Sequence, residues 1–214
     1  MYENAQEIFG YLPIRRNTPE NDYISHLWQA FMALDAGDEL AKRFAVMPFH
    51  LLFMLAVQYK VLRISRERKT EYEMAFTLNH GRNHEILLSP KSVFDLALLN
   101  ERSLPDLLKL VGLNIGGIDQ IKKLVDNRNI NLAHAQGGSE TDPEGRIEEY
   151  LAAIDTLQSC MRPLNDFISD AWVGDFSPDD NKADFIEARL LDSMFCPEDF
   201  KTGKLADNFA KYLI

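Results

Sequence analysis

The spacing of the hydrophobic residues is the feature that most limits what this 214-residue chain can form. Apolar side chains recur at steps of three and four residues over most of its length, which is the repeat of an amphipathic α-helix. Sustained alternation of apolar and polar residues is almost absent, and no Asn-Gly or Asp-Gly pair offers a tight hairpin turn. The sequence therefore predicts an all-α fold, an antiparallel helical bundle with a C-terminal helical extension.

Prolines, glycines and capping residues divide this pattern into separate helices. We expect residues 1–20 to be irregular, because Pro13 and Pro19 interrupt them. The segment over about 38–65 is apolar almost all round and should lie in the centre of the bundle, whereas residues 66–90 are polar and carry no clear pattern. The predicted helices run from a cap at Asn21 or Asp22 to near Gly37, then over about 38–65, 91–101 and 104–111, from Ile118 to Ala135, and from a capping box at Thr141 to about residue 173.

The chain is expected to have three parts. Residues 1–20 form an irregular N-terminal segment, residues 21–173 form the bundle, and residues 174–214 form an acidic extension with two further short helices. The long helix that closes the bundle should bury one stripe of side chains: Ile147, Tyr150, Ile154, Leu157, Met161, Leu164, Ile168 and Ala171.

The acidic balance of the chain limits its partners. Asp and Glu number 33 against 23 Lys and Arg, which gives a formal net charge of −10. A protein that holds duplex DNA mainly through its phosphates is normally basic. Any nucleic acid must therefore be contacted locally, at a small part of the surface.

Three further features bear on the cellular location. Cys160 and Cys196 lie far apart and outside any CxxC pattern, so we expect free thiols and no disulfide or zinc site. The first residues lack the basic region and apolar run of a signal peptide. The most apolar stretch, from Phe44 to Val57, is too short to cross a bilayer. We therefore expect a soluble, cytoplasmic protein that does not associate with membranes.

The predicted helix from Ile118 to Ala135 carries the residues with the clearest chemistry. Along one face, at alternating steps of three and four, five of six side chains are apolar and the sixth is Arg128. An arginine on a buried seam cannot lose its charge, so it needs an anion or several acceptors. The neighbouring row contains Asn127, Asn131 and His134, and the helix dipole favours a protonated imidazole in the last turn. A permanent cation beside such an imidazole suits the binding and cleavage of a phosphodiester.

This segment resembles the signature of the HEPN superfamily. That signature is an arginine, usually followed by a polar residue, and then a histidine after a short spacer. Arg128, Asn129 and His134 fill these places here, with five residues between the arginine and the histidine. The resemblance covers about residues 22–172. It implies a small helical bundle that acts as a metal-independent endoribonuclease, without a cofactor, in toxin systems or antiviral defence by abortive infection.

The resemblance also implies a role for each site residue. The RNA 2′-hydroxyl attacks its own adjacent phosphorus, with His134 as general base or acid and Arg128 stabilising the charge on the phosphate oxygens. Asn129 and Asn131 orient the phosphate or the imidazole. The remaining candidates for substrate binding are Asn127, Lys122 and Lys123. The expected partners are RNA, a second copy of the chain in a homodimer with a composite site, and a protein antitoxin or defence-complex partner.

One position departs from a well-known branch of the superfamily. In toxins that are silenced by nucleotidyl transfer, a tyrosine just beyond the histidine accepts the nucleotide. Ala135 and Gln136 occupy that stretch here. Control by direct binding of an inhibitor is therefore favoured over modification of a tyrosine.

Two alternatives remain at this stage. Arg43 and His50 also satisfy the loose spacing, but Phe44 follows that arginine and Pro48 interrupts the segment, which disfavours the pair. In the second alternative, Arg128 pairs with a buried carboxylate from another helix. The chain is then a catalytically inactive helical interaction or nucleotide-binding subunit of a larger complex.

Two charged segments have a functional and a structural interpretation. The basic run of Lys60, Arg63, Arg66, Arg68 and Lys69 offers a local RNA track, but a solvated helix face is the favoured interpretation. Four aspartates of the C-terminal extension also have two interpretations. They could mimic a nucleic acid, but the solvated start of a helix is the commoner explanation; the residues are Asp175, Asp179, Asp180 and Asp184.

His80 and His84 have the spacing of a metal-binding pair on a helix. Gly81 weakens that helix and no third ligand is evident, so a polar loop is favoured. The aromatic residues at helical spacings are predicted to lie in the core: Tyr23, Trp28, Phe31, Phe49 and Phe53.

Overall fold

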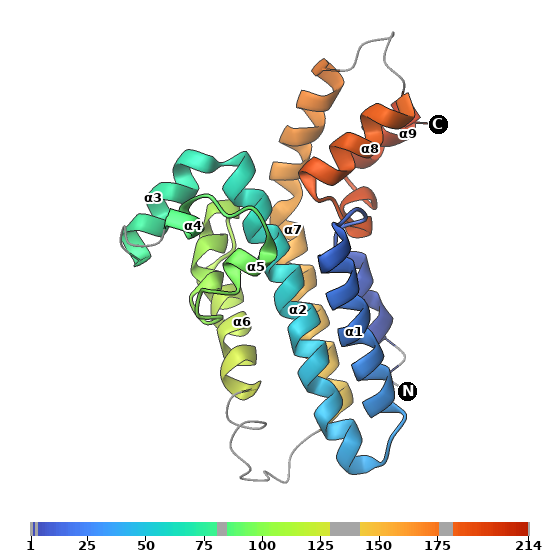
Figure 1. Ribbon diagram of the computed structural model, residues 1–214. Coiled ribbons are helices and arrows are strands. Elements are labelled where there is room, and N and C mark those ends of the chain that lie inside the picture. The colour runs from blue at the N-terminus through green and yellow to red at the C-terminus, as the bar shows by residue number, and fades with distance from the viewer. Residues whose placement is uncertain (1, 3, 81–84, 129–141, 176–181, 214) are drawn as a thin grey trace.

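The computed structural model describes residues 2, 4–80, 85–128, 142–175 and 182–213, and every regular element within these ranges is helical (Figure 1). The all-α prediction is therefore confirmed. The α-helices and 3₁₀ helices (η) are η1 (Ala5–Tyr11), α1 (Thr18–Asp35), α2 (Glu39–Glu67), α3 (Lys69–His80), α4 (Glu85–Leu88), α5 (Val93–Leu96), η2 (Leu104–Val111), α6 (Ile115–Arg128), α7 (Pro143–Asp175), α8 (Lys182–Ser193), η4 (Pro197–Phe200) and α9 (Lys204–Leu213).

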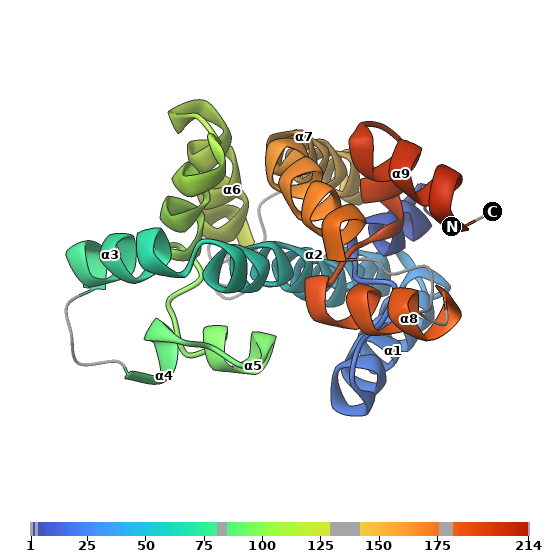
Figure 2. The same ribbon diagram turned by 90° about the horizontal axis from the view of Figure 1, so that it is seen from above.

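Helix α2 is the centre of the molecule. From above, α6 and α7 lie on one side of it and α1, α4 and α5 lie on the other (Figure 2). Phe49, Leu52 and Phe53 are fully buried, as expected of a helix that is apolar almost all round. By length and composition the segment Ala41–Glu67 is apolar enough to cross a membrane, but 89% of its most apolar window is buried inside the protein. This burial is what a central core helix requires.

The first helix begins one turn earlier than predicted. Asn17 caps α1 by accepting a hydrogen bond from the Glu20 amide at 2.9 Å, and Pro19 lies in the first turn. Proline is tolerated there because its missing N–H has no helical partner in any case. Pro19 therefore starts the helix instead of breaking it, and the predicted cap at Asn21 or Asp22 was wrong. The expectation of an irregular segment was also wrong in part, because η1 occupies Ala5–Tyr11.

Helix α6 also begins earlier than predicted. Asn114 accepts a hydrogen bond from the Gly117 amide at 2.9 Å, so the glycine pair lies in the first turn and Asp119 lies beyond it. The side chains of Ile118, Ile121 and Val125 are buried, which confirms the apolar stripe as far as it is described. The predicted continuation of this helix to Ala135 lies outside the described residues.

The long helix α7 closes the bundle as predicted. All of its expected stripe is buried except Ala171, which is exposed. The last turns of α7 extend past the end of α2 (Figure 1). Pro163 lies within the helix on its exposed side. The two further helices expected in the C-terminal extension are present as α8 and α9.

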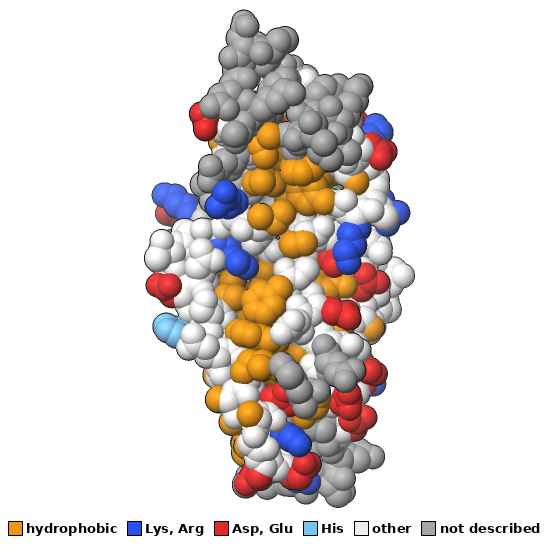
Figure 3. All heavy atoms as spheres, turned by 90° about the vertical axis from the view of Figure 1, so that its right-hand side faces the viewer, with side chains coloured by type: hydrophobic (Ala, Val, Ile, Leu, Met, Phe, Trp, Pro, Cys, Tyr) orange, Lys and Arg blue, Asp and Glu red, His pale blue; other side chains and the backbone are white. Residues whose placement is uncertain are grey.

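Most of the predicted aromatic core is confirmed. Phe31, Phe49 and Phe53 are buried and Trp28 packs partly buried against them, whereas Tyr23 is 37% exposed. Tyr23 was therefore wrongly assigned to the core. On the right-hand side of Figure 1, hydrophobic side chains gather in a band along the long axis of the molecule, with charged side chains beside it (Figure 3).

Candidate active site

Glu101 joins the end of α6 to the rest of the bundle. It lies in the turn between α5 and η2, and the Nη1 atom of Arg128 lies 2.8 Å from Glu101 Oε2 and 3.1 Å from Oε1. Both side chains are partly buried, Arg128 being 20% exposed and Glu101 25% exposed. The sequence indicated that Arg128 needs an anion, and Glu101 supplies one. This ion pair corresponds to the second alternative above, in which Arg128 pairs with a carboxylate from another part of the fold.

His50 contacts the same carboxylate from the other side. Its Nε2 atom lies 3.4 Å from Glu101 Oε2, and its Nδ1 atom lies 2.9 Å from the hydroxyl of Tyr150 on α7. The imidazole is completely buried. Arg43, which the sequence paired with His50, is exposed. We call His50, Glu101, Arg128 and Tyr150 the Glu101 cluster.

Burial and charge fix the protonation state of His50. Burial lowers the pKa of the imidazole most, and the nearby Arg128 lowers it further, while Glu101 acts in the opposite direction. The ring is therefore neutral near pH 7. An ionised carboxylate only accepts hydrogen bonds, so Nε2 carries the proton and donates to Glu101. Nδ1 then accepts from the Tyr150 hydroxyl, whose pKa burial raises.

Glu101 is the charged member that balances Arg128. Burial by itself raises the pKa of this carboxyl, but the hydrogen bond with His50 and the charge of Arg128 outweigh it, so the pKa lies below its ordinary value of 4.5. Glu101 is therefore ionised at neutral pH. Because both of its oxygens contact Nη1, it also restricts the orientation of the planar guanidinium.

A pocket of about 250 Å³ opens on the side of Glu101 that faces α1 and α5. Most of its lining is apolar, and its polar groups are the Glu101 carboxylate, the Gln58 amide and the Tyr23 hydroxyl. The Gln58 side chain forms no hydrogen bond with the described part of the chain, although only 6% of the residue is exposed. We call this cavity the Gln58 pocket; it is lined by Tyr23, Leu51, Met54, Leu55, Gln58, Phe94, Ala97 and Glu101.

The structure places only some of the predicted site residues. Arg128 lies in the Glu101 cluster, and Asn127 beside it on α6 is half-buried. Lys122 forms an ion pair with Asp106 at 2.7 Å, and Lys123 is exposed. The other predicted site residues, Asn129, Asn131 and His134, lie outside the described residues, as does His84. Among the described residues, no three His, Cys, Asp or Glu side chains are placed to hold a metal ion.

No sequence pattern indicated Glu101, Tyr150 or Gln58 as site residues, and His50 was considered only with Arg43 and discounted. The four residues come from three separate segments, α2, α7 and the turn after α5, which only the fold brings together. A signal for His50 and Gln58 was nevertheless present. Both are polar residues within the most buried helix, and such residues require hydrogen-bond partners or a ligand.

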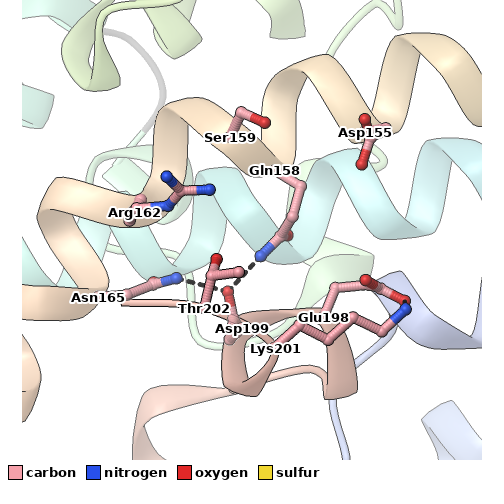
Figure 4. A pocket seen from close by; sticks show the side chains of 9 residues that line it. All are labelled: Asp155, Gln158, Ser159, Arg162, Asn165, Glu198, Asp199, Lys201 and Thr202. Atoms are coloured by element: carbon pink, nitrogen blue, oxygen red, sulfur yellow. Dashed lines mark hydrogen bonds and ion pairs between the residues drawn. The ribbon is translucent and has the colours of Figure 1, made fainter. Parts of the chain in front are cut away.

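A second polar cluster joins the C-terminal extension to the bundle. The Asp199 carboxylate on η4 accepts hydrogen bonds from Arg63 at 3.0 Å and from Asn165 at 2.6 Å. It also accepts from the Gln158 amide at 2.5 Å and from the backbone amide of Cys196 at 2.8 Å. Figure 4 shows the Gln158 and Asn165 side chains of α7 pointing at Asp199. We call these residues, together with Lys60, the Asp199 network.

The Asp199 network corrects the interpretation of the basic run. Arg63 is 1% exposed and Lys60 is 2% exposed, so neither belongs to a solvated helix face; only Arg66 and Lys69 do. Lys60 donates to Gln158 Oε1 at 2.5 Å, and the Arg63 guanidinium lies 5.0 Å from the centre of the Phe195 ring. Both cations are buried because η4 brings a carboxylate and α7 brings amides to them.

The cavity beside this network, about 190 Å³ in volume, is lined largely by polar side chains (Figure 4). Both oxygens of Asp199 already accept hydrogen bonds. The amides of Gln158 and Asn165 each donate one bond and accept another. The network therefore serves to hold η4 against α2 and α7, and the Glu101 cluster is the better candidate for chemistry.

Comparisons of the chain with protein-family models, with curated proteins and with solved structures found no match.

Proposed function

We propose that this protein is a metal-independent endoribonuclease of the HEPN type, acting as a toxin or in antiviral defence. The observation that carries the proposal is the position of Arg128. This guanidinium is at the C-terminal end of the described part of α6, where the Arg-Asn-spacer-His sequence begins, and the Glu101 carboxylate orients it. An oriented guanidinium is suited to a phosphodiester, because its planar N–H groups match two phosphate oxygens at once.

The chemistry requires few groups. The RNA 2′-oxygen forms a bond to the adjacent phosphorus and loses its proton to a base, while the bond from phosphorus to the 5′-oxygen breaks and that oxygen takes up a proton. His134 supplies the general base or acid in this scheme. Arg128 stabilises the negative charge on the non-bridging oxygens. The products carry a 2′,3′-cyclic phosphate and a 5′-hydroxyl.

Glu101 acts as a positioning residue in this proposal. Its charge compensates Arg128 in the absence of substrate, and its contact with the buried His50 ties that charge to the core. An incoming phosphate either shares the guanidinium with Glu101 or displaces it. In both cases the rigid attachment of Glu101 keeps Arg128 close to one position, which reduces the entropy lost on binding.

A second candidate function is favoured by the same ion pair. An arginine held by a carboxylate is also a common structural element, and the hydrophobic band in Figure 3 offers a surface for another protein. The second candidate is therefore a catalytically inactive helical subunit of a larger complex. The two candidates differ in whether Arg128 and His134 support cleavage.

The experiment compares cleavage of a labelled mixed-sequence RNA, in a chelating buffer, by the wild-type protein and by Arg128→Ala and His134→Ala. We expect His134→Ala to lower the cleavage rate about 100-fold or more, as for loss of a general acid or base. We expect Arg128→Ala to lower it by about 100- to 1000-fold, as for loss of a group that stabilises the transition state.

The matched control is Arg43→Ala, which removes an exposed arginine from α2 and should cleave at the wild-type rate. Thermal unfolding of each variant verifies that it is folded. Cleavage that survives His134→Ala, or that requires added magnesium, contradicts the proposed mechanism. A folded wild-type protein that cleaves no RNA supports the second candidate.

A further inference from the structure

We infer that the Gln58 pocket binds a single RNA base, with adenine the best match, beside the phosphate that Arg128 holds. The inference rests on the proposed function, which it deepens by giving the enzyme a means of selecting the nucleotide at the cleavage site. Four observations support it: an amide that no described residue pairs with, the lining of the cavity, its contact with the Arg128 ion pair, and the distribution of charge around it.

The Gln58 amide is the strongest of these observations. The residue is 94% buried in the central helix, since only 6% of it is exposed, and its side chain has no hydrogen-bond partner among the described residues. The amide atoms themselves are not enclosed, so water pairs with them in the absence of a ligand, and a ligand in the pocket has to reproduce those hydrogen bonds. Gln58 lines the pocket, where a ligand would pair with its donor and acceptor.

The rest of the cavity suits a flat, largely apolar group. Leu51, Met54 and Leu55 of α2 line one wall. The rings of Tyr23 and Phe94, which are about 40% exposed, also line the pocket, and their centres lie 5.7 Å apart with their planes at 69°. Aromatic side chains of this kind stack against bases in proteins that bind single-stranded RNA. A volume of about 250 Å³ is below the range for drug-sized ligands and suits a group the size of one base.

The pocket is also adjacent to the phosphate site. Glu101 lines the pocket and its Oε2 atom lies 2.8 Å from Arg128 Nη1, so one carboxylate is shared by the two sites. A base in the pocket and a phosphate on the guanidinium would therefore belong to the same or the neighbouring nucleotide. Binding of the base in the pocket then fixes which phosphate meets Arg128.

The charges around the site argue for recognition through a base. Lys122 is paired with Asp106, and Arg102 is paired with Asp126 at 3.0 Å. Lys60 and Arg63 are buried in the Asp199 network, and the chain as a whole carries a net charge of −10. These four cations are thus engaged by other side chains. Because contacts with phosphates carry no sequence information, selectivity has to come from contacts with a base.

The chemistry of the polar groups selects among the bases. A glutamine amide presents one donor and one acceptor side by side, which matches the N7 and N6 amino group of adenine. Glu101 is ionised and can accept a further N–H from the ligand. The adenine amino group carries two N–H bonds, so it can donate to Gln58 and to Glu101 while N7 accepts from Gln58. The edge of uracil carries a single N–H and can donate to only one of the two groups. We therefore expect adenine to be preferred to uracil.

The test measures binding of the four nucleoside monophosphates to full-length His134→Ala, by calorimetry or NMR titration. We expect AMP to bind at least about 10-fold more tightly than UMP, the range of discrimination given by one bidentate contact. Gln58→Leu, which keeps a similar volume but removes the amide, should abolish this preference. Phe94→Ala should weaken the binding of all four nucleotides. Gln29→Leu on the exposed face of α1 is the matched control and should bind as the parent protein does.

Because binding is read without cleavage, the outcome is separable from that of the proposed function. Selective AMP binding that depends on Gln58 supports the pocket even if no RNA is cleaved. Equal affinity for the four nucleotides, no binding to the folded protein, or an AMP preference unchanged by Gln58→Leu overturns the inference, whether or not the protein cleaves RNA.

Discussion

At the scale of single residues, the Glu101 carboxylate is where separate parts of the chain meet. Arg128 reaches it from α6 and His50 from α2, while Tyr150 of α7 holds the far side of the imidazole. The need of Arg128 for an anion was predictable, because an arginine interrupted an apolar stripe. The identity of the anion was not, since Glu101 lies 27 residues earlier in a turn with no distinguishing pattern.

Replacing Glu101 by glutamine should lower the stability of the protein. The substitution keeps the shape of the side chain but removes the negative charge that contacts Arg128. We expect the free energy of unfolding to fall by about 1–3 kcal/mol, the usual contribution of partly buried hydrogen bonds to charged groups. Urea denaturation measures it. Glu39→Gln is the control, because Glu39 pairs with Lys42 on the surface and should change stability by about 0.5 kcal/mol or less.

His50 should make the protein less stable at acid pH. Burial lowers the pKa of the native imidazole below its ordinary value of 6.5, so the unfolded chain takes up this proton at a higher pH than the native protein does. Stability therefore falls as the pH drops below about 6.5. In His50→Gln this part of the pH dependence should disappear. An unchanged pH profile in that variant, measured by urea denaturation against His26→Gln on the exposed face of α1, would contradict the assignment.

At the scale of secondary-structure elements, the pattern of helices was largely predictable, and the errors have physical causes. Pro19 begins α1 where it was expected to interrupt the chain, since proline fits the first turn of a helix. Lys60 and Arg63 were assigned to a solvated face because a charge run is usually exposed. Their burial depends on Asp199, which lies 136 residues after Arg63. No local pattern connects residues so distant.

Asp199 should be essential for attaching η4 to the bundle. Removing one partner of a buried ion pair leaves the other charge uncompensated, which costs about 3–5 kcal/mol. We therefore expect Asp199→Ala to lower the free energy of unfolding by this amount, measured by urea denaturation. Asp184→Ala on α8 removes an exposed carboxylate and should have little effect. A small effect of Asp199→Ala, equal to that of this control, would show that the Asp199 network does not anchor the segment.

At the scale of the whole molecule, the all-α fold followed from the sequence because its hydrophobic residues repeat with one period almost throughout. The assembly state remains a prediction. A single Arg128 offers few hydrogen-bond donors to a phosphate. Two α6 helices related by a two-fold axis would bring two sets of donors to the same phosphate. We expect sedimentation equilibrium to give a homodimer. A monomer mass that does not change with concentration, in a protein that still cleaves RNA, would contradict a composite site.

The chemical identity of the RNA ends shows whether the RNA 2′-hydroxyl attacks the adjacent phosphorus, as the proposed function requires. Wild-type protein is incubated with RNA in a chelating buffer, and the cleaved ends are analysed by mass spectrometry alongside those from His134→Ala. We expect 2′,3′-cyclic phosphate and 5′-hydroxyl ends from the wild-type protein, and a loss of these products in the variant. The same ends at the same rate from His134→Ala, or 5′-phosphate ends formed only with added magnesium, would contradict the proposed function.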